Sequence, residues 1–359
     1  MKKRYYLTGL TGLIILIALL AYSQRARIAL GVMPRAVENA LSHNPIDDLG
    51  PGLHIVLCGA GGPLPDPDRS GPCVAIIAGG NIFVVDAGTN GMRNLGRMQY
   101  PQGAIETVFL THFHSDHIDG LGEMATLRWV AGNRKKPLDV VGPTGVSDIV
   151  DGFNKAYARD ALYRHEHHGD GVAALSGSGM QAIPFTPPAI GDSTMVYDAN
   201  GLTVQMITVD HAPVAPAVGY LFTYAGRTVL VSGDTKKSDN LERFAQGVDL
   251  LVHEALSAEL VGIMHQAAEK VGNDVLAKIT TDIPDYHATP LEAAQTARDA
   301  GVGHLLYYHI VPVLLLPGTE AAWLRGVDEV FDRYTLGSDG TTLSLPAGSS
   351  EIVLVQSGL

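Results

Sequence analysis

Short apolar runs that end in glycine dominate the pattern from His54 onward. The first three are HIVLCG, VAIIAG and IFVVDAG, and turn-forming or polar residues separate them. Runs of this length between glycines predict consecutive strands of a sheet that is buried on at least one face. A helical spacing of apolar residues follows over 90–98, and 107–110 is predicted as another strand.

The alternation of helices and strands continues to residue 160. GLGEMATLRWVAG has helical spacing, LDVVGP predicts a strand, and residues 145–160 are expected to form a helix. Arg128 and Trp129 on the first of these helices are expected to serve packing. Residues 160–195 show no regular pattern, so we expect a solvated loop rather than a metal site at His165, Glu166, His167 and His168.

A second block of strands follows this insertion. It consists of LTVQMITVDH, VGYLFTYAG and TVLVSGDT, and helices are then expected over 257–279 and 290–300 before the strand HLLYYH. Two blocks of strands with interleaved helices predict an α/β fold. The expected architecture is a four-layer αββα sandwich, in which two sheets pack face to face with helices outside.

The first 23 residues follow a different pattern. Three basic residues precede 7–22, which carry no charge, and SQR follows. This layout predicts a signal peptide or an N-terminal membrane anchor. The run is shorter than the ~20 apolar residues that a spanning helix usually needs, and AYS offers small residues for cleavage. A cleaved signal peptide and a retained anchor both stay open. We expect an exported protein, periplasmic or extracellular, released or held at the inner membrane by 7–22.

Residues 24–52 are expected to form a poorly ordered connector, and 53–359 a single domain. Residues 1–35 hold six of the 25 Lys and Arg and no acidic residue, so the rest of the chain carries a net charge of −18. A domain this acidic repels phosphate backbones unless it has a local basic patch. The cluster at 134–136 is short, so we expect nucleic acid to be an unlikely partner.

The two cysteines, Cys58 and Cys73, lie at the edges of neighbouring predicted strands. In an oxidising compartment they could form one disulfide. Two buried thiols explain the pattern equally well, and the sequence leaves this choice open.

Residues that bind metals follow four of the predicted strands. They are His112, His114, Asp116 and His117 in THFHSDHIDG, then His211, Asp234 and His309. Strand ends held by a rigid sheet can bring distant ligands to one point. Imidazole and carboxylate ligands together suit zinc, and they leave manganese or iron open.

THFHSDHIDG, together with VDHAPVAPAVGY, SGDT and YYHIVP, resembles the metallo-β-lactamase fold superfamily of metal-dependent hydrolases over residues 53–345. The resemblance implies two Zn²⁺ per chain. One would be held by His112, His114 and His211, the other by Asp116, His117 and His309, with Asp234 bridging them. A water or hydroxide between the ions would be the nucleophile.

LLVHEA and DYHATPLEAAQTARDAGV are similar to the ribonuclease Z and arylsulfatase-type branch of that superfamily. The resemblance implies that Glu254 and His287 join Asp116 as catalytic residues and help to protonate the leaving oxygen. A carboxylate fixes one imidazole tautomer and prepares the other nitrogen to donate a proton. An ordinary helix cap or a surface pair is the alternative explanation for these two residues.

This sequence differs from ribonuclease Z in a segment that bears on the substrate. Ribonuclease Z has a long tRNA-gripping arm between the positions matching His211 and Asp234, whereas only 23 positions separate them here. Val313–Leu316 stand where the family often has polar residues and could form an apolar rim for an aromatic or lipid-like leaving group, but packing against a neighbouring helix explains them equally well. Lys236 and Lys237 could meet an anionic substrate, or they could simply be exposed surface lysines. We therefore expect an exported zinc hydrolase of small anionic esters, either phosphodiesters or aryl sulfates.

Three alternatives remain. A ribonuclease Z-like 3′-tRNA-processing endonuclease ranks first, followed by a lactonase or β-lactamase and then a non-catalytic metal-binding protein. The N-terminal segment makes a membrane one expected partner. A homodimer is an expected assembly by resemblance, although no sequence pattern identifies its interface.

Overall fold

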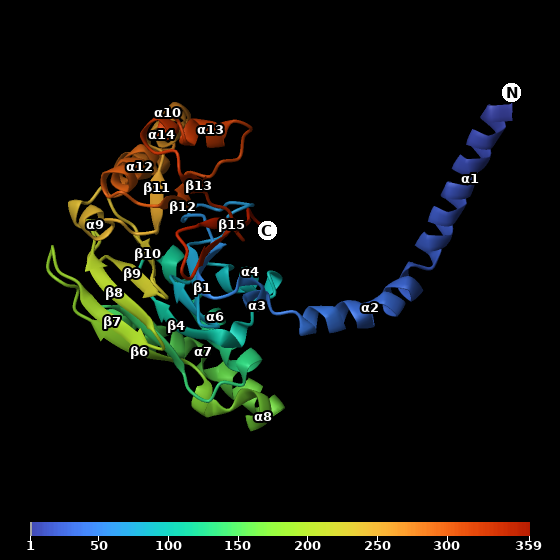
Figure 1. The fold of residues 1–359 in the computed structure, drawn as a ribbon, viewed down its shortest axis with the longest axis horizontal. Helices are drawn as coiled ribbons and strands as arrows, with labels where there is room; N and C mark the ends of the chain where they lie inside the picture. Colours follow the sequence, from blue (N-terminus) through green and yellow to red (C-terminus); the bar gives the residue numbers. More distant parts are fainter. Residues whose placement is uncertain (1) are drawn as a thin grey trace. The chain divides into compact units, whose positions relative to one another are not determined.

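The computed structural model describes residues 2–359, with side-chain surroundings from residue 10 onward (Figure 1). The chain divides into two compact units, 1–45 and 46–359, which are treated separately below. The sequence places the start of the folded domain at residue 53, seven positions later.

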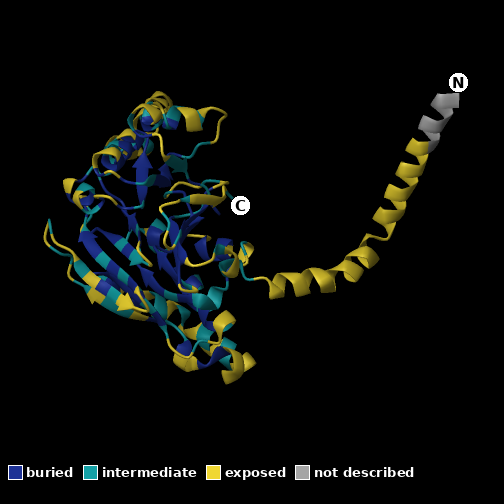
Figure 2. Ribbon diagram, viewed as in Figure 1, coloured by how far each residue is buried: buried dark blue, intermediate teal, exposed yellow. Residues whose placement is uncertain are grey.

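The N-terminal unit is helical. It contains α1 (Lys2–Ser23) and α2 (Arg25–Ser42), which are exposed along their described length (Figure 2). Among the described residues, no single helix is long and apolar enough to cross a membrane. Leu10–Ser23 and Arg25–Ser42 meet that test only as a pair bent by 70°. The structure forms helices over most of 25–49, where the sequence predicts a poorly ordered connector, because alanine, leucine and arginine in α2 favour helix.

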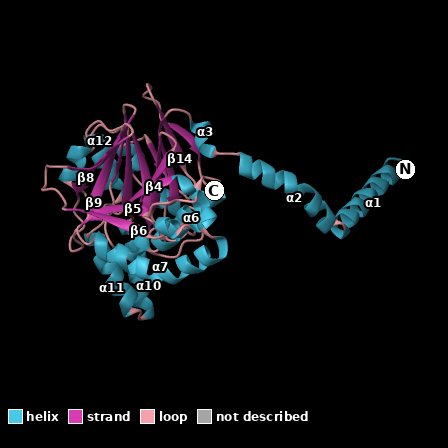
Figure 3. Cartoon of the chain, turned by 90° about the horizontal axis from the view of Figure 1, so that it is seen from below, coloured by secondary structure: helices cyan, strands magenta, loops and turns pink. Residues whose placement is uncertain are grey.

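The larger unit contains two sheets with helices outside them (Figure 3). The first sheet has the order β15-β14-β1-β2-β3-β4-β5-β6. Its strands are β1 (Gly52–Gly59), β2 (Cys73–Ala78), β3 (Asn81–Val85), β4 (Ile105–Phe109), β5 (Leu138–Pro143), β6 (Met180–Phe185), β14 (Thr342–Pro346) and β15 (Val353–Gln356). The first and last parts of the unit therefore share one sheet, through antiparallel pairing of β1 with β14.

The second sheet has the order β13-β12-β11-β10-β9-β8-β7. Its strands are β7 (Thr194–Ala199), β8 (Leu202–Thr208), β9 (Val218–Tyr224), β10 (Arg227–Val231), β11 (Leu250–Leu256), β12 (His304–Val311) and β13 (Tyr334–Leu336). β10, β11, β12 and β13 pair in parallel, so the C-terminal ends of these four strands lie at one edge.

Each sheet is covered by its own helices. α4 (Gly91–Arg97), α6 (Leu121–Gly132) and α7 (Val146–His168) share an apolar cluster with the first sheet, whereas α9 (Asp239–Phe244) and α12 (Pro290–Asp299) share one with the second. The shorter helices are α3 (Pro45–Leu49), α5 (Ser115–Ile118), α8 (Asp170–Ala173), α13 (Thr319–Trp323) and α14 (Val327–Val330). The predicted αββα sandwich is confirmed.

Burial on both faces explains the continuous apolar runs in the sequence. In β2, Val74 and Ile76 join the core between the sheets, whereas Ala75 and Ile77 face the helices. A strand that is covered on both sides has no position left for a polar residue.

Two helical segments differ from the prediction. α7 continues to His168, eight residues beyond its expected end, so the histidine-rich run is helical rather than looped. The helix expected over 257–279 is two helices, α10 (Ala258–Val271) and α11 (Asp274–Asp282). Gly272, at φ 71°, ends the first helix, and the side chain of Asn273 caps the second by accepting a hydrogen bond from the Leu276 amide.

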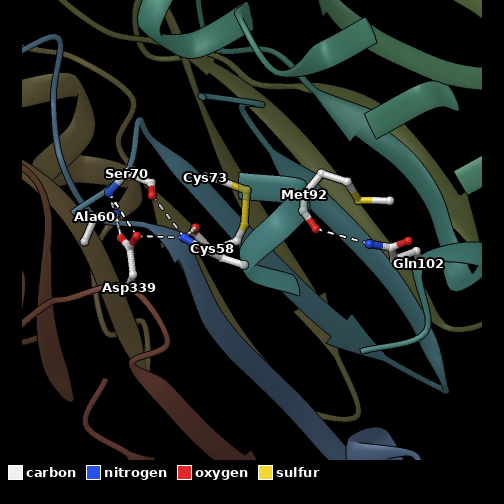
Figure 4. Close-up of a disulfide and its surroundings, with 8 residues drawn as sticks. Cys58, Ala60, Ser70, Cys73, Met92, Gln102 and Asp339 are labelled. Atoms are coloured by element: carbon white, nitrogen blue, oxygen red, sulfur yellow. Dashed lines mark hydrogen bonds between the residues drawn. A yellow bond between two sulfur atoms is a disulfide. The ribbon is translucent and has the colours of Figure 1, made fainter. Parts of the chain in front are cut away.

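A disulfide joins Cys58 and Cys73, whose Cα atoms lie 5.0 Å apart, and closes the loop between β1 and β2 (Figure 4). The carboxylate of Asp339 holds the same loop by accepting hydrogen bonds from the backbone amides of Ala60 and Ser70 at 2.9–3.0 Å. The loop that borders the site described next is therefore fixed at both of its ends.

Candidate active site

The seven metal-type residues predicted from the sequence come together at one edge of the sandwich. They follow or end the strands β4, β8, β10 and β12. Candidate ligand atoms of His112, His114, His211 and Asp234 all lie within 4.8 Å of one another, and so do those of Asp116, His117 and His309.

Asp234 lies between the two groups. Its Oδ2 atom is 3.4 Å from Nε2 of both His117 and His309, and 3.7 Å from Nε2 of His112. The same oxygen is 3.9 Å from Nε2 of His211. This central position suits a carboxylate that serves both groups, as the resemblance implies.

His309 reaches the site through an irregularity in β12. Tyr308 pairs with Glu254 and Ile310 with Ala255 on the neighbouring strand, which leaves His309 between them without a pairing partner. Its φ of 45° is uncommon for a residue other than glycine. The backbone departs from regular strand geometry where the histidine is needed.

The cluster fits a divalent cation. Nε2 of His117, Nε2 of His211 and Oδ1 of Asp234 are buried and have no hydrogen-bond partner. Leaving such atoms unsatisfied costs free energy, and a cation bound between imidazoles and carboxylates would satisfy them. Burial lowers the pKa of His112 and of His211, so both imidazoles are available in the neutral form that metals need.

Asp86, at the end of β3, supports the cluster from behind. Its buried carboxylate accepts hydrogen bonds from the amide and hydroxyl of Thr111 and from Nδ1 of His117, each at 2.8 Å. Bonding at Nδ1 leaves Nε2 of His117 free to bind a cation. Asp86 was not among the predicted site residues, although an acidic residue ending the apolar run IFVVDAG was a usable signal.

A second support comes from the backbone. Nδ1 of His211 donates a hydrogen bond to the carbonyl oxygen of Tyr286 at 2.8 Å, which fixes the tautomer of that histidine. No side-chain pattern in the sequence could reveal this contact.

Glu254 and His287 form the predicted pair. Oε1 of Glu254 lies 3.2 Å from Nδ1 of His287 and accepts the backbone amides of Thr235 and Ala288. Candidate ligand atoms of His287, Asp234 and His309 lie within 4.8 Å of one another, so the pair adjoins the cluster.

The charge of Glu254 keeps His287 protonated. Burial alone would lower the pKa of His287, but the negative charge of Glu254 and the hydrogen bond between them raise that pKa to about 9. Glu254 therefore favours the protonated form of His287. The helix-cap alternative is wrong, because α12 is capped by Thr289 in a capping box with Glu292.

The remaining candidates lie outside this site. His165 binds the carbonyl oxygen of Ala173, and none of the described metal-type groups includes the histidines of α7. Arg128 and Trp129 pack as expected, because each is buried and donates to backbone carbonyls. Lys236 lies 3.5 Å from Asp210, and Lys237 lies 3.5 Å from Gln295.

The apolar rim also needs a correction. Leu315 and Leu316, expected to border the site, are 64% and 71% exposed. Val311 and Pro312, just before the expected segment, line the cavity beside the metal-type cluster instead.

Comparison with known proteins identifies the family. Residues 81–310 match the model of the beta-lactamase superfamily domain. Ribonuclease Z of Mycobacterium marinum is 35% identical over 290 residues, which is 80% of this chain and 96% of that protein. Ribonuclease Z of Mycobacterium bovis is 34% identical over 294 residues, with the same coverage.

Solved structures show the same fold. The short form of human tRNase Z aligns with a TM-score of 0.60 at 19% identity, covering 82% of this chain and 99% of that one. The metallo-beta-lactamase fold protein YhfI from Bacillus subtilis aligns with a TM-score of 0.58 at 18% identity, covering 81% and 98%.

These relatives contradict two expectations from the sequence. A hydrolase of small anionic esters was expected, and nucleic acid was considered an unlikely partner. Both expectations are wrong, because relatives at 34–35% identity over 80% of this chain are named for action on RNA. Nothing in the comparisons supports aryl sulfate hydrolysis.

Neither the missing arm nor the net charge excludes an RNA substrate. The Mycobacterium marinum protein aligns with this chain over 290 residues, which make up 96% of its length and 80% of this chain. Because nearly all of that relative is matched, it has no room for a long inserted arm. The missing arm therefore does not set this chain apart from it. Net charge, in turn, describes the whole surface and not the field at one site.

Fold, clustered ligands and relatives agree. The chain belongs to the metallo-β-lactamase fold superfamily of metal-dependent hydrolases, in the branch that contains ribonuclease Z.

Proposed function

We propose that this protein is an endoribonuclease of the ribonuclease Z type, which hydrolyses a phosphodiester bond near the 3′ end of tRNA precursors. The observation that carries the proposal is the buried pair of Glu254 and His287, which lies directly beside a cluster suited to divalent cations. The mycobacterial relatives named ribonuclease Z support the choice of RNA as substrate.

Divalent cations held by the cluster would neutralise charge on a phosphodiester and lower the pKa of a bound water. The cations proposed here are two zinc ions, which the imidazole and carboxylate ligands of the cluster suit. Asp116 and Asp234 supply the carboxylates, and Asp86 keeps His117 oriented.

His287 acts on the leaving group. As the water oxygen bonds to phosphorus, the bond from phosphorus to the departing oxygen breaks, and that oxygen needs a proton. The protonated His287 supplies it from Nε2, because its Nδ1 is engaged by Glu254. Glu254 thereby orients the imidazole and stabilises its charge before transfer.

The test uses the full chain, purified with zinc in detergent, and a precursor tRNA transcript with a 3′ trailer. We expect one discrete cut near the end of the mature sequence, lost by more than about hundredfold in Asp234→Ala. Asp210→Ala, which changes an exposed carboxylate near the site, is the matched control and should retain activity. Wild-type protein that binds metal but leaves the transcript intact would refute the proposal.

A further inference from the structure

A cavity of 280 Å³ opens beside the metal-type cluster. Asp116, Asp234, His287 and His309 bound one side of it. The other walls come from α10, α11 and the ends of β11 and β12, and they include Met264, Leu276, Ile279 and Val311. We call this space the apolar cavity.

We propose that the apolar cavity holds the base of the nucleotide that departs when the phosphodiester is cut. This inference rests on the proposed function, since it requires RNA as the substrate. The side of the cut follows from His287, which lines the cavity and would protonate the departing oxygen. A nucleoside attached to that oxygen must lie next to His287, and the space there is this cavity.

The chemistry of the walls suits a base better than a phosphate. Apart from the cluster and His287, the described residues that line the cavity are uncharged. Phosphate backbones are bound through Lys and Arg, and this lining offers neither. A flat base, by contrast, gains free energy by leaving water for a surface of aliphatic and aromatic groups.

Two residues are suited to contact an aromatic ring. Tyr286, which lines the cavity with its ring centroid 4.8 Å from that of His287, can stack on a base. Met264, on α10, also lines the cavity, and its thioether packs well against aromatic rings.

The apolar walls favour stacking over reading of base identity. The hydroxyl of Thr280, on the α11 wall, donates to the carbonyl oxygen of Leu276 at 2.7 Å, so its proton is already engaged. Stacking tolerates any base, because every base presents a flat face. The cavity should therefore require a base at this position without selecting among the four.

The experiment compares a natural tRNA precursor with versions that carry an abasic nucleotide on either side of the cut. The product end that bears a hydroxyl rather than a phosphate identifies the departing nucleotide. We expect removal of its base to lower kcat/KM by roughly 5- to 150-fold, matching ~1–3 kcal/mol of stacking. Removal of the base on the other side should have a smaller effect.

Leu276→Trp fills the cavity from α11, and Val275→Trp is the matched control because Val275 is 71% exposed and does not line the cavity. Leu276→Trp should slow cleavage of natural RNA while leaving the abasic substrate almost unaffected. If Leu276→Trp fails to fold, Met264→Trp repeats the test from α10, with the exposed Ile263→Trp as control.

Several outcomes overturn the inference. Equal rates of cleavage of natural and abasic RNA would show that the base does not bind in the cavity. An equal loss of activity on both substrates in Leu276→Trp would show the same. Faster turnover of a phosphodiester with an alkyl chain on its leaving oxygen would assign the cavity to a lipid. Failure to cut any RNA is a different result, since it refutes the proposed function itself.

Discussion

At the scale of single residues, Asp86 connects two parts of the site. Its carboxylate binds both Thr111 and His117, so one buried charge positions the start and the end of the histidine motif. Metal affinity should depend on this residue even though it is not among the clustered ligands.

We expect Asp86→Asn to weaken metal binding by about 10- to 100-fold, because the amide carries no charge to stabilise the His117 tautomer. Competition with a chromogenic chelator would measure the affinity. Asp119→Asn, which changes an exposed carboxylate two residues from His117, is the control. Unchanged affinity in Asp86→Asn would show that the hydrogen bond is dispensable.

Glu254 controls the pH dependence. His287 must be protonated to act, so kcat should fall as pH rises through its pKa, which Glu254 raises to about 9. In Glu254→Gln the charge is lost while burial remains, so this pKa falls and the decline begins at lower pH. Bound cations shift both profiles downward, so the comparison is made between variants at the same metal loading.

A pH series of kcat for wild type, Glu254→Gln and the surface control Glu259→Gln would measure the shift. Glu259 pairs with Arg325 at the protein surface and should leave the profile unchanged. If the pH profile of Glu254→Gln overlays that of the wild type, His287 does not donate the proton.

Residues that follow strands were predictable, whereas supporting contacts made through the backbone, such as that of the Tyr286 carbonyl oxygen with His211, were not. His112, His211, Asp234 and His309 stand at the ends of apolar runs, where a fixed sheet can bring them together. The supporting contacts depend on which strand lies beside which. The unpaired position of His309 likewise depends on a shift in register between β11 and β12.

At the scale of elements, the disulfide is the clearest constraint. It closes a loop of 15 residues between β1 and β2, so it restricts the unfolded chain more than the folded one. We expect the double variant Cys58→Ser, Cys73→Ser to lose about 3 kcal/mol of unfolding free energy.

Urea unfolding with and without a reductant would test this. Reductant should lower the stability of the wild type to that of the double variant and leave the double variant unchanged. Equal stability of all four samples would mean that the two cysteines do not stabilise the fold.

Helix boundaries were less predictable than helix positions. The break between α10 and α11 follows from Gly272 and the capping side chain of Asn273, which a search for periodicity passes over. The same break produces two short helices whose inner faces line the apolar cavity. A feature missed in the sequence therefore shapes the substrate site.

At the scale of the whole molecule, export stays a prediction, and the disulfide offers a way to test it. Disulfides persist in oxidising compartments and are rare in the cytosol. Both cysteines are buried, so the cells are quenched with acid and the protein is alkylated after denaturation. If the chain is exported, Cys58 and Cys73 should remain unmodified, with the protein in the periplasmic, secreted or membrane fraction. Full alkylation in the cytosolic fraction would contradict export.

The overall charge was a poor guide to the substrate. A net charge of −18 beyond residue 35 correctly describes an acidic surface. It does not describe the edge of the sandwich where cations would bind. A few bound cations change the local field more than the distant surface charges, which salt screens.

The pairing of β1 with β14 has a consequence for the time at which the protein becomes active. The loop beside the site is held by hydrogen bonds to Asp339, although 279 positions separate that residue from Ala60. The ribosome must therefore have passed Asp339 before these hydrogen bonds can form. A nascent chain that has not reached Asp339 can already contain every residue of the metal-type cluster, but it lacks the contacts that hold the loop beside them.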